Sequence, residues 1–164
     1  MPAVGNTSPI LNLAIIGQLD LLRQQFGEVV IPPMVLQELR IDTELPGVES
    51  IRLALQNRWL RVVELSNTDI TRALRRDLDN GEAEAIALAL QLKLTTILID
   101  EHDGRAAAKA MGLIPVGVLG VLLRAKRAGT LNSVVTAMHA LQDQAGFFIN
   151  PDLFATLARE AGER

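Results

Sequence analysis

The chain has 164 residues, which is long enough for one domain with a sizeable core. Hydrophobic residues make up 49% of it and the formal net charge is −3. This composition excludes disorder and argues against a protein that coats nucleic acid through an overall positive charge. The absence of cysteine rules out disulfides, zinc fingers and iron–sulfur sites. Residues 1–9 lack a basic start and a long apolar region, and no apolar run approaches the ~20 residues that span a bilayer. We therefore expect a cytoplasmic protein without a membrane segment.

Short apolar segments alternate with amphipathic ones along the chain, and Gly, Pro and N-capping residues separate them. Ser8 with Pro9 is typical of a helix start, Ser8 being the N-cap, and Asp103 is the expected N-cap of a later helix. The predicted elements, in chain order, are strand 3–6, helix 9–16, helix 18–26, strand 28–31, helix 33–40, helix 48–57, strand 60–65, helix 68–77, helix 81–93, strand 95–99, helix 103–111, strand 114–118, and helices 119–128, 133–145 and 151–160.

Buried strands that alternate with helices predict an α/β fold, with a mainly parallel sheet of about five short strands covered on both sides. No repeat, low-complexity tract or linker divides the chain, so we expect a single domain over residues 1–164. The helices of residues 131–164 would pack on the core or form a dimer interface. In such folds, sites form beyond the carboxyl ends of the strands.

Two glutamates lie near the start of the apolar helix 81–93. At ~100° per residue, Glu82 and Glu84 point about 200° apart and cannot share a face. Glu84 aligns with Asp77 and Gln91 on a polar stripe, which predicts contact with water. Glu82 aligns with apolar residues and is predicted to point inward. Its position three residues after Asp79 also fits a capping box, which by itself explains the side chain without a ligand.

Other polar residues stand where strands end. Asn6 ends the first strand, Asp100 and Glu101 follow the apolar segment 95–99, and Glu38 borders the apolar side of its helix. Each has an ordinary structural explanation, such as a surface position for Glu101 or an ion pair for Glu38. As a set, however, carboxylates that converge on one crevice need a cation, because close like charges raise each other's pKa.

The ligands available favour a hard cation. Carboxylate oxygens, no cysteine and two histidines without ligand-like spacing suit Mg²⁺ or Mn²⁺ and not zinc. His102 lies beside the acids but reads as a surface residue. Arg105, the basic residue nearest to Asp100, is the best phosphate contact that the sequence offers.

Five motifs in a fixed order carry a resemblance that covers nearly the whole chain. They are VGNTSPILNLAIIGQLDLL, GEVVIPPMVLQELR, LDNGEAEAIALAL, LIDEHDGRAAAKAMGL and VGVLGVLLRAKRAG. With these motifs the sequence resembles the PIN-domain family, small metal-dependent nucleases that include the VapC-like toxins of bacterial toxin–antitoxin pairs. It is most similar to a subgroup of predicted nucleic-acid-binding PIN proteins.

The resemblance implies a three-layer α/β/α fold with an acidic pocket that holds Mg²⁺ or Mn²⁺. Carried over by position, the catalytic and metal-binding residues fall on Asn6, Glu38, Glu82, and Asp100 or Glu101. Thr7 and Ser8 lie beside the first ligand, where they and Arg105 would contact the substrate. The departure is Asn6, where many PIN nucleases carry Asp. An amide oxygen can ligate a hard cation but adds no negative charge.

The resemblance therefore implies a Mg²⁺- or Mn²⁺-dependent endoribonuclease, the toxin of a toxin–antitoxin pair. Its partners would be RNA, an antitoxin protein and a second copy of the chain in a homodimer. The alternative is a catalytically weak or silent module that binds RNA or a partner protein, because Asn6 weakens the site. A phosphohydrolase or phospho-receiver ranks last, since Asn6 cannot serve as the aspartyl nucleophile.

Overall fold

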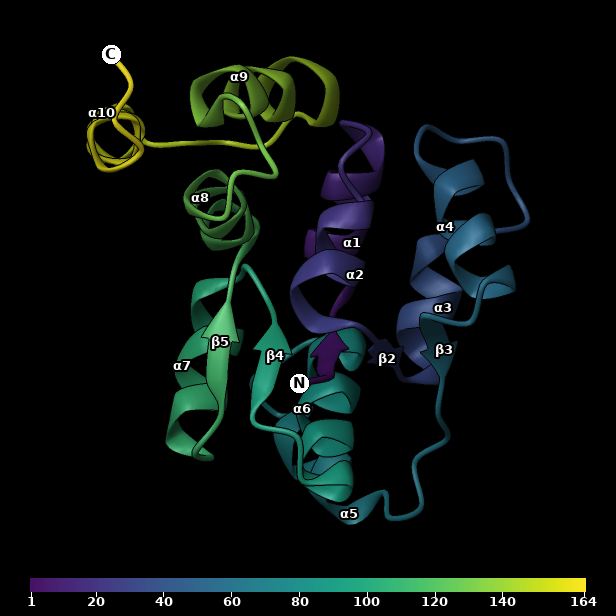
Figure 1. Cartoon of the computed structure of the whole chain (residues 1–164). Helices are drawn as coiled ribbons and strands as arrows, with labels where there is room; N and C mark the ends of the chain where they lie inside the picture. Colours follow the sequence, from purple (N-terminus) through teal and green to yellow (C-terminus); the bar gives the residue numbers. More distant parts are fainter.

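The computed structural model describes all 164 residues and contains five strands and ten helices (Figure 1). The strands are β1 (Ala3–Gly5), β2 (Val29–Ile31), β3 (Leu60–Val62), β4 (Thr96–Leu98) and β5 (Ile114–Val116). The helices are α1 (Thr7–Ile15), α2 (Asp20–Phe26), α3 (Pro33–Leu39), α4 (Val48–Gln56), α5 (Asp69–Leu74), α6 (Asn80–Leu92), α7 (His102–Ala110), α8 (Val118–Arg127), α9 (Val134–Ala145) and α10 (Pro151–Glu160). All the predicted elements are present, and their ends differ by a few residues.

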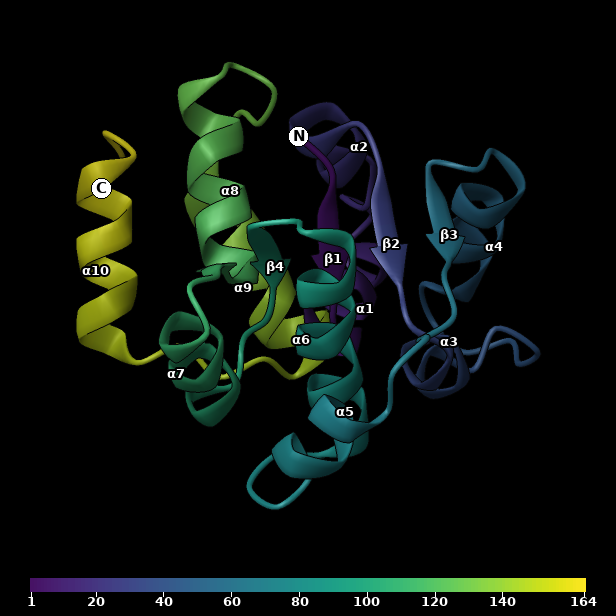
Figure 2. The same cartoon turned by 90° about the horizontal axis from the view of Figure 1, so that it is seen from below.

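The strands form one parallel sheet in the order β3-β2-β1-β4-β5. Successive side chains of a strand point to opposite faces, so Ala3 joins the core on one face and Val4 the core on the other. The larger core lies under α1, α2, α4, α8 and α9, and the smaller one under α5, α6 and α7. Figure 2 looks onto the face that α5, α6 and α7 cover. The predicted three-layer α/β/α architecture with a parallel sheet is confirmed.

Two predicted helix starts are wrong. Helix α1 begins at Thr7 after the extended residue Asn6, so Ser8 lies inside the helix and is not its N-cap. Pro9 is tolerated in this first turn because the first four helical N–H groups have no partner within the helix. Helix α7 begins at His102 after the extended residue Glu101, and Asp103 lies in its first turn. In both cases the helix starts nearer to the strand than the capping signal indicates.

The C-terminal helices pack onto the rest of the chain. Helix α9 contacts α1 and α8, and α10 contacts α9. None of the ten helices combines the length and the apolar content that a membrane crossing requires.

Glu163 joins the end of the chain to the start of α9. Its carboxylate accepts hydrogen bonds from the Ser133 hydroxyl at 2.7 Å and from the amides of Val134 and Val135 at 2.7 and 3.1 Å. The Lys126 ammonium lies 3.3 Å away. Burial acts against the charged form, but these donors prevail and lower the pKa of Glu163 to about 2. The carboxylate also complements the positive end of the α9 dipole.

Replacing Glu163 with Gln is expected to lower the free energy of unfolding by about 1 kcal/mol at pH 7, as for loss of a helix cap. The pKa of Glu163 is lowered on folding from 4.5 to about 2. Its stabilisation is therefore complete above pH 4.5 and disappears as the pH falls toward 2. Urea unfolding at pH 7 and pH 3 measures both effects. The exposed Glu160→Gln variant is the control, and equal stability of the two variants would contradict this role of Glu163.

Candidate active site

The strand order reverses between β1 and β4. Strands β2 and β3 are added on one side of β1, and β4 and β5 are added on the other side. Such a switch point leaves a crevice beyond the carboxyl ends of the two strands. Asn6 follows β1 directly, and Asp100 and Glu101 follow β4 after one residue. Asn6 and Asp100 thus lie at the same edge of the sheet, although they are far apart in the sequence.

A hollow of about 440 Å³ opens at this edge, and we call it the acidic hollow. Its lining residues are Asn6, Thr7, Ser8, Leu11, Asn12, Glu38, Asp79 and Glu101. Three of them are acids from different parts of the chain, and none is a lysine or an arginine. The hollow therefore brings together oxygen ligands without a cationic side chain to neutralise them.

Glu38 reaches the acidic hollow from α3. Its Oε1 accepts a hydrogen bond of 2.6 Å from the Thr7 hydroxyl. A Cβ at Gly81 would overlap that carboxylate, so the absence of a side chain at Gly81 gives Glu38 its place beside the start of α6. Glu38 forms no ion pair, so the ion pair that would have explained this residue without a ligand is absent.

Glu82 lies beneath the surface and is only 5% exposed. It forms a capping box with Asp79: the Glu82 amide donates to Asp79 Oδ1 at 2.8 Å, and the Asp79 amide donates to Glu82 Oε1 at 3.4 Å. Its other oxygen, Oε2, is buried without a hydrogen-bond partner. The predicted inward direction and the predicted capping box are both confirmed. Capping uses one carboxylate oxygen and leaves the second free for a ligand.

The pKa of Glu82 is raised from 4.5 to about 7. Burial is the main cause, and the negative charges of Asp79 and Glu101 add to it. A buried carboxyl group without a positive neighbour keeps its proton to a higher pH than an exposed one. A bound cation would displace that proton.

Asp100 is held by two donors, the Ser8 hydroxyl at 2.9 Å from Oδ2 and the Val118 amide at 2.8 Å from Oδ1. Burial raises the pKa of Asp100 even though both hydrogen bonds act to lower it. Asp100 lines a second hollow that adjoins the acidic hollow and shares Ser8, Asn12 and Glu101 with it. Of the two acids after β4, it is Glu101 that lines the acidic hollow beside Asn6 and Glu38.

Asn6 is 5% exposed, and its amide oxygen Oδ1 is buried without a partner. Its backbone amide donates to the Leu98 carbonyl at 2.9 Å, which joins the end of β1 to β4. Thr7 and Ser8 each donate to a site carboxylate, as described above. Arg105 lies near Asp100, and its Nη1 donates to the Ile99 carbonyl at 3.0 Å. The His102 side chain is 96% exposed, and its one polar contact is with Asp103 Oδ1 at 3.5 Å.

The prediction that Glu84 contacts water is wrong. Its Oε1 accepts the Met34 amide at 3.1 Å, its Oε2 pairs with the Arg75 guanidinium at 3.2 Å, and its side chain is 11% exposed. Helix α6 is buried over the whole stretch from residue 81 to residue 89, with α3 and α5 against it as well as the sheet. A helix enclosed on all sides has no water-facing stripe for Glu84 to occupy.

The donor set fits a hard divalent cation. Asn6 Oδ1 and Glu82 Oε2 are buried acceptors without donors, and the acids around them are not neutralised by basic residues. Oxygen ligands of this kind suit Mg²⁺ or Mn²⁺. No three carboxylate or imidazole side chains converge closely enough to form a complete metal site by themselves. A cation bound here would therefore also need oxygens from other groups, such as Asn6 Oδ1 or water.

Sequence reasoning missed three features of this region. Asn12 lines the acidic hollow and donates to the Ser8 hydroxyl at 3.1 Å, a contact that the spacing of four residues on one helix could have indicated. Asp79 also lines the acidic hollow, in addition to capping α6. Phe148 lines the adjoining hollow, and no local pattern relates it to Asp100.

The fold and the site together define a class of protein. It is an α/β protein with a parallel sheet and, at the switch point of that sheet, oxygen ligands suited to a hard cation. The chain belongs to the PIN-domain family, whose model matches residues 2–163. PIN domains are generally metal-dependent nucleases, so the chain is at this level a hydrolase that acts on nucleic acid. No curated protein and no solved structure matches it.

Proposed function

We propose that this PIN domain is a Mg²⁺- or Mn²⁺-dependent endoribonuclease that hydrolyses RNA phosphodiester bonds. The observation that carries the proposal is a pair of buried oxygens without a hydrogen-bond partner. Asn6, which carries the first, lines the acidic hollow with Glu38 and Glu101. Glu82 Oε2, the second, lies beneath the surface beside Gly104, where the charges of Asp79 and Glu101 act on it. Burying such acceptors without a partner costs free energy, so their retention favours a ligand-binding role.

In this proposal Asn6, Glu38 and Glu82 hold the cation, together with Asp100 or Glu101. A divalent cation, when bound, lowers the pKa of a water and stabilises the charge that builds on the phosphate. The Thr7 and Ser8 hydroxyls position Glu38 and Asp100 through their hydrogen bonds and lie where substrate would enter. Arg105, which the Ile99 carbonyl orients, holds a phosphate of the RNA.

The toxin role rests on the resemblance to VapC-like proteins, as do an antitoxin partner and a homodimer. This step is an analogy between families and not a physical argument. A short open reading frame next to the gene would support it.

Asn6 supports a second candidate function, a module that binds RNA or a partner protein without cutting. An amide at this position contributes one negative charge fewer than the Asp that many PIN nucleases carry. The two candidates differ in what the Asn6→Asp variant does.

Cleavage of a labelled RNA with Mg²⁺, Mn²⁺ or EDTA tests both candidates. We expect the wild-type chain to cut only with a cation, and Asp100→Asn to lose about 100-fold or more, as for removal of a group that stabilises the transition state. The exposed Asp143→Asn variant should keep full activity. Cleavage that appears only in Asn6→Asp would support the silent module, and cleavage that persists in EDTA would contradict the proposed metal site.

A further inference from the structure

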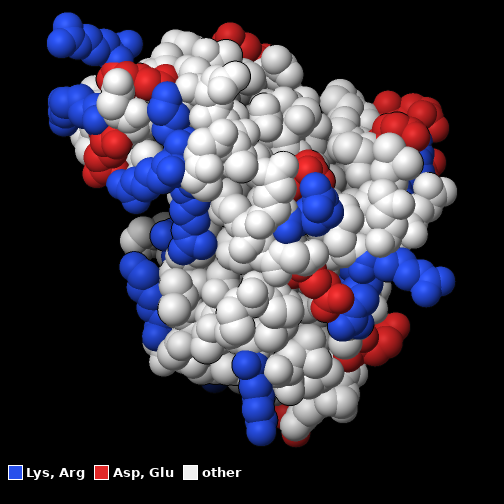
Figure 3. All heavy atoms as spheres, viewed as in Figure 1, with Lys and Arg blue, Asp and Glu red and all other residues white.

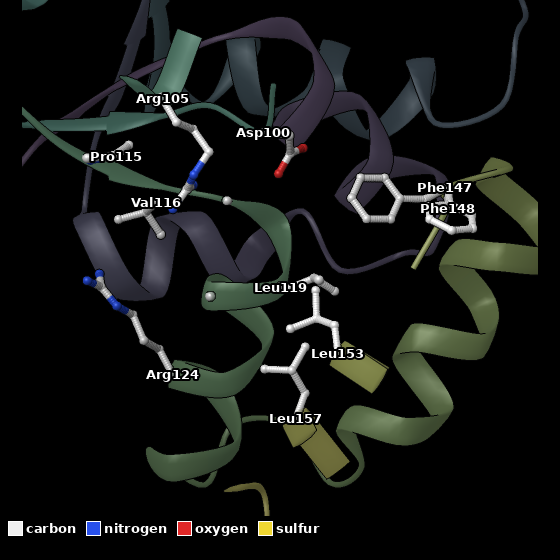
Figure 4. A pocket seen from close by; sticks show the side chains of 12 residues that line it. Asp100, Arg105, Pro115, Val116, Leu119, Arg124, Phe147, Phe148, Leu153 and Leu157 are labelled. Atoms are coloured by element: carbon white, nitrogen blue, oxygen red, sulfur yellow. The ribbon is translucent and has the colours of Figure 1, made fainter. Parts of the chain in front are cut away.

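A cleft of about 500 Å³ lies between α8, α10 and the segment that joins α9 to α10 (Figure 4). Leu119, Leu153 and Leu157 form its apolar part, and Phe147 and Phe148 form an aromatic wall. Two guanidinium groups, Arg105 and Arg124, stand on the opposite side, with Asp100 between them and the aromatic pair. Ligand sites of small organic groups have this volume and this mixture of apolar walls with a few polar groups.

Phe148 is the unusual member of this cleft, because its side chain is 81% exposed. A phenylalanine gains no stability from such a position, since its ring remains in water. Phe147, the neighbouring residue, is half-buried and packs against the main core. The exposed ring of Phe148 thus adjoins a residue that is anchored to the core, with the Phe147 amide donating to the Leu141 carbonyl at 3.0 Å, and its face is open to a stacking partner.

The cleft continues into the proposed active site. Asp100, Phe147 and Phe148 line both the cleft and the hollow that contains Ser8, Asn12 and Glu101. That hollow in turn shares Ser8, Asn12 and Glu101 with the acidic hollow. A ligand that extends out of the acidic hollow on this side therefore meets Phe148 next.

The charge on this side of the molecule complements a phosphate backbone. Basic side chains run along the side where α10, α8 and α7 lie in Figure 1 (Figure 3). Helix α7 contributes Arg105 and Lys109, and α8 contributes the exposed Arg124 and Arg127. Arg124 forms no ion pair and lies over the Phe26 ring at 5.9 Å, so its donors remain available.

We propose that this cleft binds the base of one unpaired nucleotide, next to the phosphate that lies in the acidic hollow. The base stacks on Phe148, and Arg105 and Arg124 contact the flanking phosphates. Its position relative to a cleaved bond rests on the proposed nuclease function. Bases stack on aromatic side chains whatever their identity, and a base within a duplex is already stacked on its neighbours. The cleft therefore selects an unpaired nucleotide without reading its sequence.

Binding in EDTA tests the proposal without requiring cleavage. The probes are a short fluorescent single-stranded RNA and a blunt RNA duplex of the same length, with affinity measured by anisotropy on the full chain. Phe148→Ala is expected to weaken binding of the single strand on the order of 10-fold, as for loss of one stacked base, and to leave binding of the duplex unchanged. Phe148→Trp should restore the affinity, because it restores a ring. Leu53→Ala, at an exposed leucine of α4, is the matched control.

Equal affinity of Phe148→Ala and the wild-type chain for the single strand would overturn the proposal, as would equal weakening for single strand and duplex. A change from dimer to monomer in Phe148→Ala, measured by sedimentation without RNA, would also overturn it and assign the cleft to contact between copies. If the Phe148 effect is found but no RNA is cut with Mg²⁺ or Mn²⁺, the base-binding cleft is supported and only the nuclease proposal fails.

Discussion

The Glu82→Gln variant is expected to lose RNA cleavage by about 100-fold or more and yet to unfold at a higher temperature than the wild-type chain when divalent cations are removed. The two effects have one cause. Glu82 carries a buried carboxylate oxygen without a partner, beside the acids Asp79 and Glu101. Glutamine removes the negative charge that would bind a cation. It also removes the cost of burying that charge near Asp79 and Glu101 when no cation is bound.

The pH dependence follows from the raised pKa of Glu82, which changes from 4.5 to about 7 on folding. Between these values the folded chain binds more protons than the unfolded chain, so its stability falls as the pH rises. The advantage of Glu82→Gln is therefore absent below pH 4.5 and complete above pH 7. We expect about 1–2 kcal/mol at pH 8 after solvent screening, or a few degrees in Tm.

Glutamine is the informative replacement because its side-chain oxygen can still accept the Asp79 amide, and the capping box is kept. Thermal unfolding in EDTA at pH 4.5 and pH 8, then with Mn²⁺, measures the effect. Mn²⁺ should raise the Tm of the wild-type chain and not that of Glu82→Gln. The exposed Glu64→Gln variant should behave like the wild-type chain. A Glu82→Gln variant that is less stable than wild type at pH 8, or that still cuts RNA at full rate, would exclude the proposed role.

The Glu84→Ala variant is expected to lose about 2–3 kcal/mol of stability, the largest loss that we predict for a single charged residue. Glu84 is a buried carboxylate that binds the Met34 amide in the first turn of α3 and the Arg75 guanidinium at the end of α5. Its removal leaves the Met34 amide unpaired and opens a space in an enclosed helix interface.

Arg75→Ala should cost less, about 1–2 kcal/mol, because the Met34 amide still satisfies part of the Glu84 charge. The neighbouring exposed Arg72→Ala should cost almost nothing. Urea unfolding with an unchanged m-value gives these differences. Since α3 carries Glu38 and α6 carries Glu82, RNA cleavage should fall in Glu84→Ala even where the chain remains folded. Glu84→Ala and Arg72→Ala of equal stability would show that the pair contributes no more than an exposed salt bridge.

The elements and their order were predictable because the signals are local. Residues 95–99 are two β-branched threonines followed by three aliphatic residues, and Asp79 lies three residues before Glu82, so both the strand and the capping box are visible within a few residues. Helix starts were less predictable. Ser8 and Asp103 are good N-cap residues, but the strands before them end so close by that the helices begin one or two residues earlier.

Amphipathicity describes one face of a helix against the other, and it gave the right direction for Glu82 and the wrong one for Glu84. Helical periodicity indicates a water-exposed stripe only where the face opposite to the core meets water. Helix α6 instead has the sheet on one side and α3 and α5 on others. Which helices pack on which side depends on contacts between residues distant in the sequence, such as Met34 with Glu84, and no local period contains that information.

The amino-acid sequence by itself determined a parallel α/β fold, an inward and capping Glu82, and the set of acids that follow its strands. Only the tertiary structure decided that Glu101 shares the acidic hollow with Asn6 and Glu38, that Ser8 holds Asp100 across 92 residues, and that Phe148 extends the site. The reason is physical. Secondary structure follows from neighbours within one or two turns, whereas a site forms where the ends of separate strands and helices meet.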